Sequence, residues 1–328
     1  LGAKLNVLKT PENFNNDIGT PLTLLGLAPE HEAAVIETGM NHFGEIEYLG
    51  AMVRPDIAVI SNIGDAHIEY LGSREGILKA KCEIFEHLKA DGVAILNGDD
   101  ALLDTVTLPQ RIVRCGQSEH CETRISDIVD HGVDGITCTV TTSRDTYALT
   151  IPAPGEHMAY SASMAVAVGE ELGLSREEIV RGVAAYEPTG SRMRVIRLPG
   201  GRVLLDDCYN ANPSSMRASV GNFLAEPLEE RQRRVLILGD MLELGDWSER
   251  EHAAIIEMAA QDPEAELLLV GPEFAKAYDG LAEKPANVTL CPTRDDLISL
   301  LKVSPVEHSL VLVKGSHGMG LEQALEAL

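Results

Sequence analysis

The sequence is poor in aromatic and basic residues, which argues against a nucleic-acid-binding protein. Aromatic residues make up 4% of the 328 residues, and 27 Lys and Arg stand against 51 Asp and Glu, for a formal net charge of −24. A protein that binds a phosphate backbone needs a basic surface to release counterions. The short basic cluster at residues 231–234 precedes a predicted strand, and we expect it to be solvated. An acidic chain can still bind phosphates locally, through a helix N-terminus, a lysine or Mg²⁺.

The absence of other sequence features indicates the compartment in which the protein works. The six cysteines form no C-x-x-C pair, so neither a zinc site nor a disulfide framework is indicated. No basic-then-apolar leader opens the chain and no run of 18 apolar residues occurs, so we expect neither a visible secretion signal nor a membrane span. A reducing cytosol fits best, and we expect a cytoplasmic protein. Because the chain starts at Leu1 without an initiator Met, we expect it to be a piece of a longer protein.

The first part of the chain alternates strand and helix patterns, which predicts an α/β fold. The strand patterns lie at residues 33–37, 57–62, 92–97 and 111–115, and helical patterns lie near 44–53 and 74–89. Between residues 121 and 154 the pattern changes to short β-rich pieces at 136–142 and 147–151, which predicts an antiparallel extension of the sheet. Helical patterns near 158–172 and 175–186 follow, and residues 187–190 break the pattern. We therefore predict two domains, residues 1–187 and 188–328.

The second part of the chain predicts a further, Rossmann-like α/β unit. A hairpin pattern covers residues 194–205. Strand patterns at 234–238, 266–270 and 310–314 alternate with helical ones at 213–225, 248–260, 294–302 and 319–328. No G-x-G-x-x-G occurs, so a dinucleotide is not implied.

Three reactive residues fall at successive strand-to-helix junctions in the first domain. Val35 and Ile36 close an apolar run just before Glu37, and the run 57–60 closes before the segment that carries His67. These runs predict buried parallel strands, and ligands of doubly wound sheets collect where such strands end. Each residue alone could be structural. Together, Glu37, His67 and Lys81 indicate a metal-phosphate site with Mg²⁺ in one crevice.

Lys81 lies on an apolar stripe with Ile77, Phe85 and Leu88. A lysine held against a sheet loses solvation in its charged form, which lowers its pKa and leaves neutral amine that can react with CO₂ to a carbamate. The carbamate would supply an anionic oxygen to Mg²⁺. The alternative is a stem that packs its methylenes and extends its ammonium to water.

Residues 13–21 read as a polar loop that opens a helix with Pro21 at its first position. Free N–H groups at such a helix start suit an anion. A capping loop with no ligand is the alternative.

Several longer motifs together carry a resemblance to a known family. They are the segments 13–21, 37–41 with Gly44 and Glu45, 62–72, 80–81, 96–100, 206–213 (Asp-Asp-Cys-Tyr-Asn-Ala-Asn-Pro), 238–245 (Leu-Gly-Asp-Met-Leu-Glu-Leu-Gly) and 313–316. From the first residues to the last, the chain resembles the MurF type of Mur ligase. The resemblance implies an incomplete, mostly parallel central ATP-binding domain without its P-loop, followed by the Rossmann-like C-terminal domain.

The resemblance also implies an activity and a set of site residues. The reaction would be ATP-dependent amide bond formation that adds D-Ala-D-Ala to UDP-N-acetylmuramoyl-tripeptide in cytoplasmic peptidoglycan synthesis. Glu37 and His67 would bind magnesium, and Lys81 would be carbamylated. The residues implied to contact the nucleotide are Arg192, Asp207, His157 and Asn97. Those implied to contact substrate are Asn15, Asn16, Asn41, Tyr209, Asn210, Asn212 and Lys314.

The sequence departs from the family pattern at four points. No G-x-x-x-x-G-K-[ST] occurs, so we expect the phosphate loop to lie upstream and the chain alone to turn over negligibly. Met158 and Ser161 stand where the family has two asparagines near the nucleotide base. His317 stands where an arginine follows the serine, and it offers a weaker, pH-dependent cation to a carboxylate.

Two other functions stay open at this point. One is a non-catalytic Mur-ligase-like protein that kept the fold for binding or scaffolding, although Glu37, His67 and Lys81 favour an enzyme. The other is a related amide ligase such as a folylpolyglutamate synthase, against which the Tyr-Asn-Ala-Asn-Pro motif argues. The sequence leaves the oligomeric state and the diamino acid of the tripeptide open.

Overall fold

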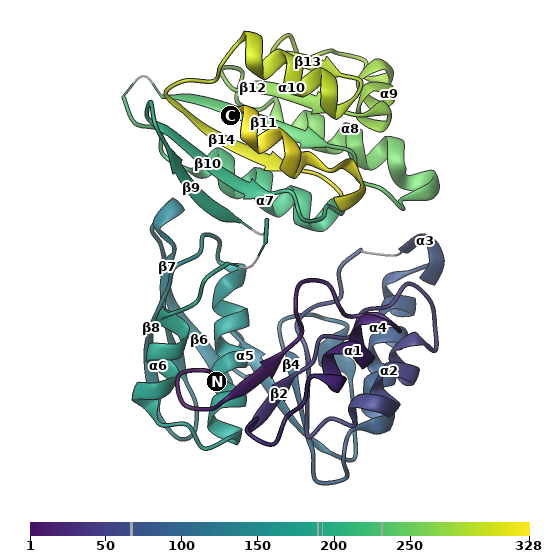
Figure 1. The fold of residues 1–328 in the computed structure, drawn as a ribbon, viewed down its shortest axis with the longest axis vertical. Coiled ribbons are helices and arrows are strands. Elements are labelled where there is room, and N and C mark those ends of the chain that lie inside the picture. Colours follow the sequence, from purple (N-terminus) through teal and green to yellow (C-terminus); the bar gives the residue numbers. More distant parts are fainter. Residues whose placement is uncertain (66–67, 189, 192, 231) are drawn as a thin grey trace. The chain divides into compact units, whose positions relative to one another are not determined.

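The computed structural model of the protein describes residues 1–65, 68–188, 190–191, 193–230 and 232–328. The chain divides into two compact units, Leu1–Glu187 (unit 1) and Pro188–Leu328 (unit 2). Each unit contains its own six-stranded sheet with helices packed against it (Figure 1). Within the described ranges, no helix is both long and apolar enough to cross a membrane.

The large sheet of unit 1 has the strand order β3-β4-β5-β6-β7-β8. The strands from β3 to β6 pair in parallel, whereas β6 with β7 and β7 with β8 pair antiparallel. The predicted antiparallel extension is therefore confirmed. The strands are β1 (Val7–Lys9), β2 (Ala33–Val35), β3 (Ile57–Ile60), β4 (Val93–Asn97), β5 (Arg111–Gly116), β6 (Thr123–Asp130), β7 (Ile136–Thr141) and β8 (Thr146–Ile151). The helices are α1 (Gly19–Leu25), α2 (Glu45–Val53), α3 (Ile68–Leu71), α4 (Arg74–Cys82), α5 (His157–Glu171) and α6 (Arg176–Ala184).

The strand before Glu37 differs from its prediction. In the part of unit 1 that the structure describes, β2 pairs with β1 in a separate two-stranded parallel sheet and not with β3. Val35 on β2 is 49% exposed, and Val59 on β3 is 47% exposed. The prediction of two fully buried strands is therefore wrong. An apolar run looks the same in sequence whether one face or both faces are covered.

Unit 2 has the strand order β13-β12-β11-β14-β10-β9, and all neighbours are parallel except β10 and β9. This is the predicted α/β arrangement. The strands are β9 (Arg194–Leu198), β10 (Arg202–Asp207), β11 (Arg233–Gly239), β12 (Glu266–Val270), β13 (Val288–Cys291) and β14 (Ser309–Lys314). The helices are α7 (Pro213–Ala225), α8 (Ser248–Ala259), α9 (Pro272–Gly280) and α10 (Arg294–Val303).

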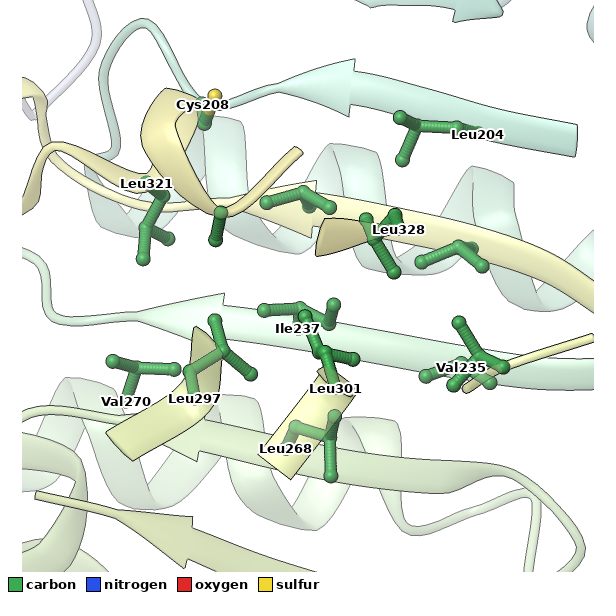
Figure 2. Close-up of a cluster of buried hydrophobic side chains, with 14 of the residues drawn as sticks. Leu204, Cys208, Val235, Ile237, Leu268, Val270, Leu297, Leu301, Leu321 and Leu328 are labelled. Atoms are coloured by element: carbon green, nitrogen blue, oxygen red, sulfur yellow. The ribbon is translucent and has the colours of Figure 1, made fainter. Parts of the chain in front are cut away.

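One face of this sheet forms a large apolar core. Side chains of β10, β11 and β12, such as Leu204, Ile237 and Leu268, pack with Leu301 of α10 and with Leu321 near the C-terminus (Figure 2). The chain end was predicted as one helix over 319–328, but it forms two 3-10 segments, His317–Met319 and Leu321–Ala327. Packing on the core holds this end in place, so a regular α-helix is not needed there.

Several short elements were missed by the sequence reasoning. They include the strands β1 and β13 and the helices α3 and α9. The strands are three and four residues long, which is too short for a period to stand out. The N-terminus of α9 is capped from a distance, since the Asp240 carboxylate accepts hydrogen bonds from the N–H groups of Glu273 and Phe274 at 3.0 and 2.9 Å. No neighbouring side chain caps this helix, so its local start signal was Pro272 at the first position, which the sequence reasoning did not use.

A buried ion pair joins the carboxyl ends of β10 and β14. Lys314 is 2% exposed and Asp207 is 8% exposed. The ammonium of Lys314 donates to Asp207 Oδ2 at 2.7 Å and to the carbonyl of Asn210 at 3.1 Å. Ser219 and the backbone N–H of Met193 also donate to the Asp207 carboxylate, at 2.7 and 3.1 Å. Both charges of the pair thus have hydrogen-bonded partners, which offsets part of the cost of burying them.

We expect Lys314→Met to destabilise unit 2 by about 3–5 kcal/mol, because it leaves the Asp207 carboxylate buried without its cation. The single tryptophan, Trp247, lies in unit 2, so its fluorescence during urea unfolding measures the free energy of unfolding of this unit. The control is Lys302→Met on the exposed surface of α10, with an expected change within about 0.5 kcal/mol. Equal effects of the two substitutions would show that the buried charge of Asp207 does not need Lys314.

Candidate functional sites at the strand ends

The Glu37 carboxylate lies in a loop that is tied to the polar segment 13–16. Asn15 Nδ2 donates to Glu37 Oε1 at 2.9 Å, and the N–H of Gly39 donates to the carbonyl of Asn15 at 2.7 Å. The N–H of Glu37 donates to the hydroxyl oxygen of Thr10 at 2.8 Å. A Cβ on Gly39 would lie 2.9 Å from Asn15 Cγ, so this close approach requires glycine. The structure thus brings two predicted site residues, Asn15 and Glu37, into direct contact.

Asn16, another predicted substrate contact, caps α1. Its Oδ1 accepts hydrogen bonds from the N–H groups of Ile18 and Gly19 at 3.1 and 2.8 Å. The helix begins at Gly19, so Pro21 is its third residue and not its first as predicted. The N–H groups of Ile18 and Gly19 are therefore bonded within the loop, as the alternative of a capping loop expects. The contact of Asn16 with substrate stays a prediction.

Asn41 begins a turn that is bonded to α2 and to the 3-10 segment Glu83–His87, which directly follows α4. Its N–H donates to Glu45 Oε2 at 2.6 Å, and the N–H of Gly44 donates to the carboxylate of Glu83 at 2.9 and 3.0 Å. The turn needs Gly44, whose φ is +84°. Its backbone is thus fixed by two acidic side chains, while the Asn41 side chain lies at an exposed position.

The loop after β3 is held by three side chains, and one of them is Lys81. The ammonium of Lys81 donates to the carbonyl of Asn62 at 3.0 Å. Arg74 donates to the carbonyl of Ile63 through Nη2 at 2.7 Å and Nε at 3.1 Å. Asp100, in the loop after β4, accepts the N–H of Ile63 at 2.9 Å. Two consecutive peptide units are thus fixed by α4 and by the neighbouring strand end.

The environment of Lys81 matches the predicted apolar stripe, since Ile77, Phe85 and Leu88 are all buried. Burial lowers the pKa of Lys81, and the nearby Asp100 carboxylate partly opposes the shift. The lysine is half-buried, with its ammonium on the backbone of the site loop. A lowered pKa makes more of the neutral amine available, as carbamate formation requires.

The third predicted ligand, His67, lies outside the residues that the structure describes, as does Arg192. Across the described ranges, no three His, Cys, Asp or Glu side chains are grouped to hold a metal. Met40, Ile63 and Ala80 nevertheless belong to one apolar cluster, so the loops after β2 and β3 and helix α4 share a core. An exposed carboxylate at Glu37 and a Lys81 that could become a carbamate are oxygen donors of the kind that Mg²⁺ prefers.

A polar cluster that the sequence reasoning missed lies beside Asn97. The Asp99 carboxylate accepts the N–H of Gln117 at 2.6 Å and the hydroxyl of Tyr160 at 3.0 Å, and Gln117 Nε2 donates to Tyr160 at 2.9 Å. Burial would raise the pKa of Asp99, but these hydrogen bonds and those from Ser118 hold it below its ordinary value. The cluster joins the loops after β4 and β5 to α5. The run of two aspartates after a strand was the available signal.

Asn97 and the start of α5 lie next to this cluster. Asn97 Oδ1 accepts the N–H of Asp99 at 3.0 Å, and His157 is the first residue of α5 and exposed. Met158 packs against the apolar core of this part of unit 1, and Ser161 is exposed. Met158 is therefore used for packing, and the nucleotide contacts of Asn97 and His157 stay predictions.

Three of the predicted substrate residues of unit 2, Tyr209, Asn210 and Asn212, lie in one loop, residues 208–212, after β10, and the fourth, Lys314, is the last residue of β14. Asn210 Oδ1 accepts the N–H of Ala211 at 2.8 Å, and Asn212 Oδ1 caps α7 by accepting the N–H of Ser215 at 2.9 Å. The rings of Tyr209 and His317 lie 5.7 Å apart. Asp207 and Lys314 are bonded to each other, so they fix the base of this loop. Their contacts with nucleotide and substrate stay predictions.

Ser316 was not predicted as a site residue, yet it connects three loops. Its hydroxyl donates to the carbonyl of Ala211 at 3.2 Å and accepts the N–H of Leu242 at 2.9 Å. Its own N–H donates to the carbonyl of Asp240 at 3.1 Å. These loops follow β10, β11 and β14, which are neighbours in the sheet. In parallel sheets this is the edge where ligands bind.

Comparison with known proteins covers both units. Residues 1–169 match the Mur ligase middle domain, and residues 191–317 match the glutamate ligase domain of Mur ligases. The UDP-N-acetylmuramoyl-tripeptide--D-alanyl-D-alanine ligase of Bacillus subtilis is 36% identical over 330 residues, which is all of this chain and 71% of that protein. The enzyme of the same name from Escherichia coli is also 36% identical, over 98% of this chain and 71% of its own length.

A solved structure leads to the same family. The crystal structure of MurF from Acinetobacter baumannii superposes with a TM-score of 0.88 at 31% identity, over 99% of this chain and 71% of that one. The likeness covers the residues of both units, including the strand-end loops described above. The chain therefore belongs to the Mur ligase family, and within it to the MurF type.

Proposed function

We propose that this chain forms the ATP-dependent part of a ligase that joins D-Ala-D-Ala to UDP-N-acetylmuramoyl-tripeptide. The observation that carries the proposal is the relationship over the whole chain to ligases named for these two substrates. The 206–213 and 238–245 motifs, which are typical of this type of ligase, lie in loops connected by Ser316. We place the reaction in the cytoplasm, where ATP is available.

The proposed reaction has two steps. The γ-phosphoryl group of ATP is transferred to the terminal carboxylate of the tripeptide, which leaves ADP and an acyl phosphate. The amine of D-Ala-D-Ala then forms a C–N bond at that carbonyl, loses a proton and expels inorganic phosphate. Both steps require anionic reactants to be held together, so positioning and charge compensation account for most of the catalysis.

In unit 1, we assign Glu37 together with His67 and a carbamylated Lys81 to the binding of magnesium. When bound, the ion offsets the charge of the phosphoryl group. Asn15 orients the Glu37 carboxylate through its 2.9 Å hydrogen bond. Arg74 and Asp100 fix the loop to which Lys81 is bonded. These contacts hold the donor groups in place before the nucleotide arrives, which lowers the cost of binding.

In unit 2, we assign the loop 208–212 to contacts with substrate. Its geometry is set by the Asp207–Lys314 pair at its start and by the Asn212 cap at its end. The exposed His317 ring next to Tyr209 provides a place for a carboxylate of the dipeptide. We assign Asp207, together with Arg192, to contacts with the nucleotide.

The 328-residue chain contains no G-x-x-x-x-G-K-[ST], so we expect it to form negligible product with ATP and both substrates. A fusion to the residues that precede the matching segment in the Bacillus subtilis relative should restore ligation, because it supplies the loop that holds the phosphates. Release of phosphate and formation of the pentapeptide product are the measurements. A fusion that folds and binds ATP yet makes no product would instead favour the scaffold alternative.

In the active fusion, we expect Lys81→Ala to lower kcat by at least about 100-fold, because it removes the amine that supports the metal site. Short carboxylic acids should recover part of the activity by supplying the missing anionic oxygen. Lys79→Ala is the matched control, since Lys79 lies on the same helix and its ammonium lies 5.4 Å from the Phe43 ring. Unchanged activity of Lys81→Ala would show that the role assigned to Lys81 is wrong.

A further inference from the structure

A buried histidine in unit 2 is bonded to the loop after β11. His252 of α8 is 0% exposed, and its Nε2 accepts the N–H of Met241 at 3.0 Å. Its Nδ1 donates to the carbonyl of Ser248 at 2.7 Å. With Nδ1 as the donor and Nε2 as the acceptor, the ring is a neutral imidazole in one defined tautomer.

The partner loop is fixed on its other side by Asp240. The Asp240 carboxylate caps α9, and the backbone carbonyl of Asp240 accepts the N–H of Ser316. Gly271, just before α9, has a φ of +114°, and a Cβ there would lie 2.3 Å from Asp240 Oδ2. The carboxylate therefore fills space that any other side chain at position 271 would occupy. The loop after β11 therefore has little conformational freedom at Asp240 and Met241.

The hydrogen bonds continue from this loop to the substrate loop. Met241 is bonded to His252, and the next residue, Leu242, donates its N–H to Ser316 Oγ at 2.9 Å. The same hydroxyl donates to the carbonyl of Ala211 at 3.2 Å. Ala211 lies between Asn210 and Asn212 in the loop 208–212. A short series of hydrogen bonds thus connects the imidazole with the residues assigned to substrate.

We propose that His252 is a positioning residue of the ligase: as a neutral acceptor it fixes the turn at Met241 and, through Ser316, the loop 208–212. The inference rests on the proposed function, because that loop is assigned there to substrate. A phenylalanine is a somewhat larger planar ring that keeps the edge contact with Phe274, whose ring centre lies 4.6 Å from that of His252. It could not accept the Met241 N–H, which would be left buried and unsatisfied.

The charged and polar groups that face His252 come from three elements. They are Asp240, at 3.9 Å from Nε2, Glu273 of α9, and Ser248 and Glu251 of α8 itself. Burial lowers the pKa of His252 even though the three carboxylates oppose this shift. The imidazole therefore stays neutral in the folded protein at a pH where it is protonated in the unfolded chain. As pH falls through about 6.5, the unfolded state gains the proton and stability is lost.

The experiment compares His252→Phe with His252→Gln, whose side-chain oxygen can accept the Met241 N–H. Hydrogen exchange in the 328-residue chain should become about five- to tenfold faster at Leu242 and within 208–212 in His252→Phe, and should be largely restored in His252→Gln. His308→Gln is the matched control. His308 directly precedes β14, at the end of the strand away from Ser316, and its Nε2 bonds the carbonyl of Glu230. This substitution should leave exchange at 208–212 unchanged.

In the active fusion, His252→Phe should lower kcat about 10- to 100-fold or raise KM for D-Ala-D-Ala, with recovery in His252→Gln. On lowering pH from about 8 to about 5.5, the wild-type chain should lose more thermal stability than His252→Gln, which has no imidazole to protonate. Normal exchange at 208–212 in His252→Phe, or equal kinetic defects in both variants, would overturn the proposal. A wild-type fusion without ligase activity would instead contradict the proposed function, while the exchange result would still decide the role of His252.

Discussion

Hydrogen bonding of the backbone at the carboxyl ends of parallel strands is the constraint on which both sites depend. A strand that ends at this edge leaves N–H and C=O groups that must be paired. In unit 1, Lys81, Arg74 and Asp100 supply the partners for Asn62 and Ile63. In unit 2, Ser316 and His252 supply them for Ala211, Leu242 and Met241. The side chains that complete the fold are therefore next to, or the same as, those assigned to chemistry.

This overlap divides the predicted site residues into two groups. Asn16 and Asn212 cap helices, and Lys314 is bonded to Asp207, so the atoms that were expected to meet a ligand already have partners within the chain. Glu37 and Tyr209 lie in loops whose backbone is held by other residues. The first group sets the shape of the site. In the second group, the Glu37 carboxylate accepts a hydrogen bond from Asn15 and lies at an exposed position, where a ligand can reach it. The two roles support each other, because a ligand binds more tightly to a loop that is already ordered.

Much of the fold was predictable because apolar periodicity and turn residues are local signals. The parallel strands, the antiparallel extension near residues 136–151 and the apolar stripe around Lys81 follow from such patterns. The cap of α9 was not predictable, since Asp240 lies more than thirty positions earlier in the chain, although Pro272 at the first position of the helix was a local start signal. The exposure of β2 was missed because covering a strand face depends on distant elements. The Asp99–Tyr160 contact and the bond from His252 to Met241 likewise join residues that no local pattern connects.

The open strand edges of unit 1 have a practical consequence. In the described part of the chain β3 lies at one edge of its sheet, and both β2 and β3 expose a valine on their surface. A free edge offers unpaired backbone groups, and an apolar side chain beside it favours the approach of another strand. Self-association of the isolated chain should therefore begin at residues 33–35 and 57–60. A lysine in place of Val59 would discourage such pairing without disturbing the buried face of β3, and would suit the chain to concentrated solutions.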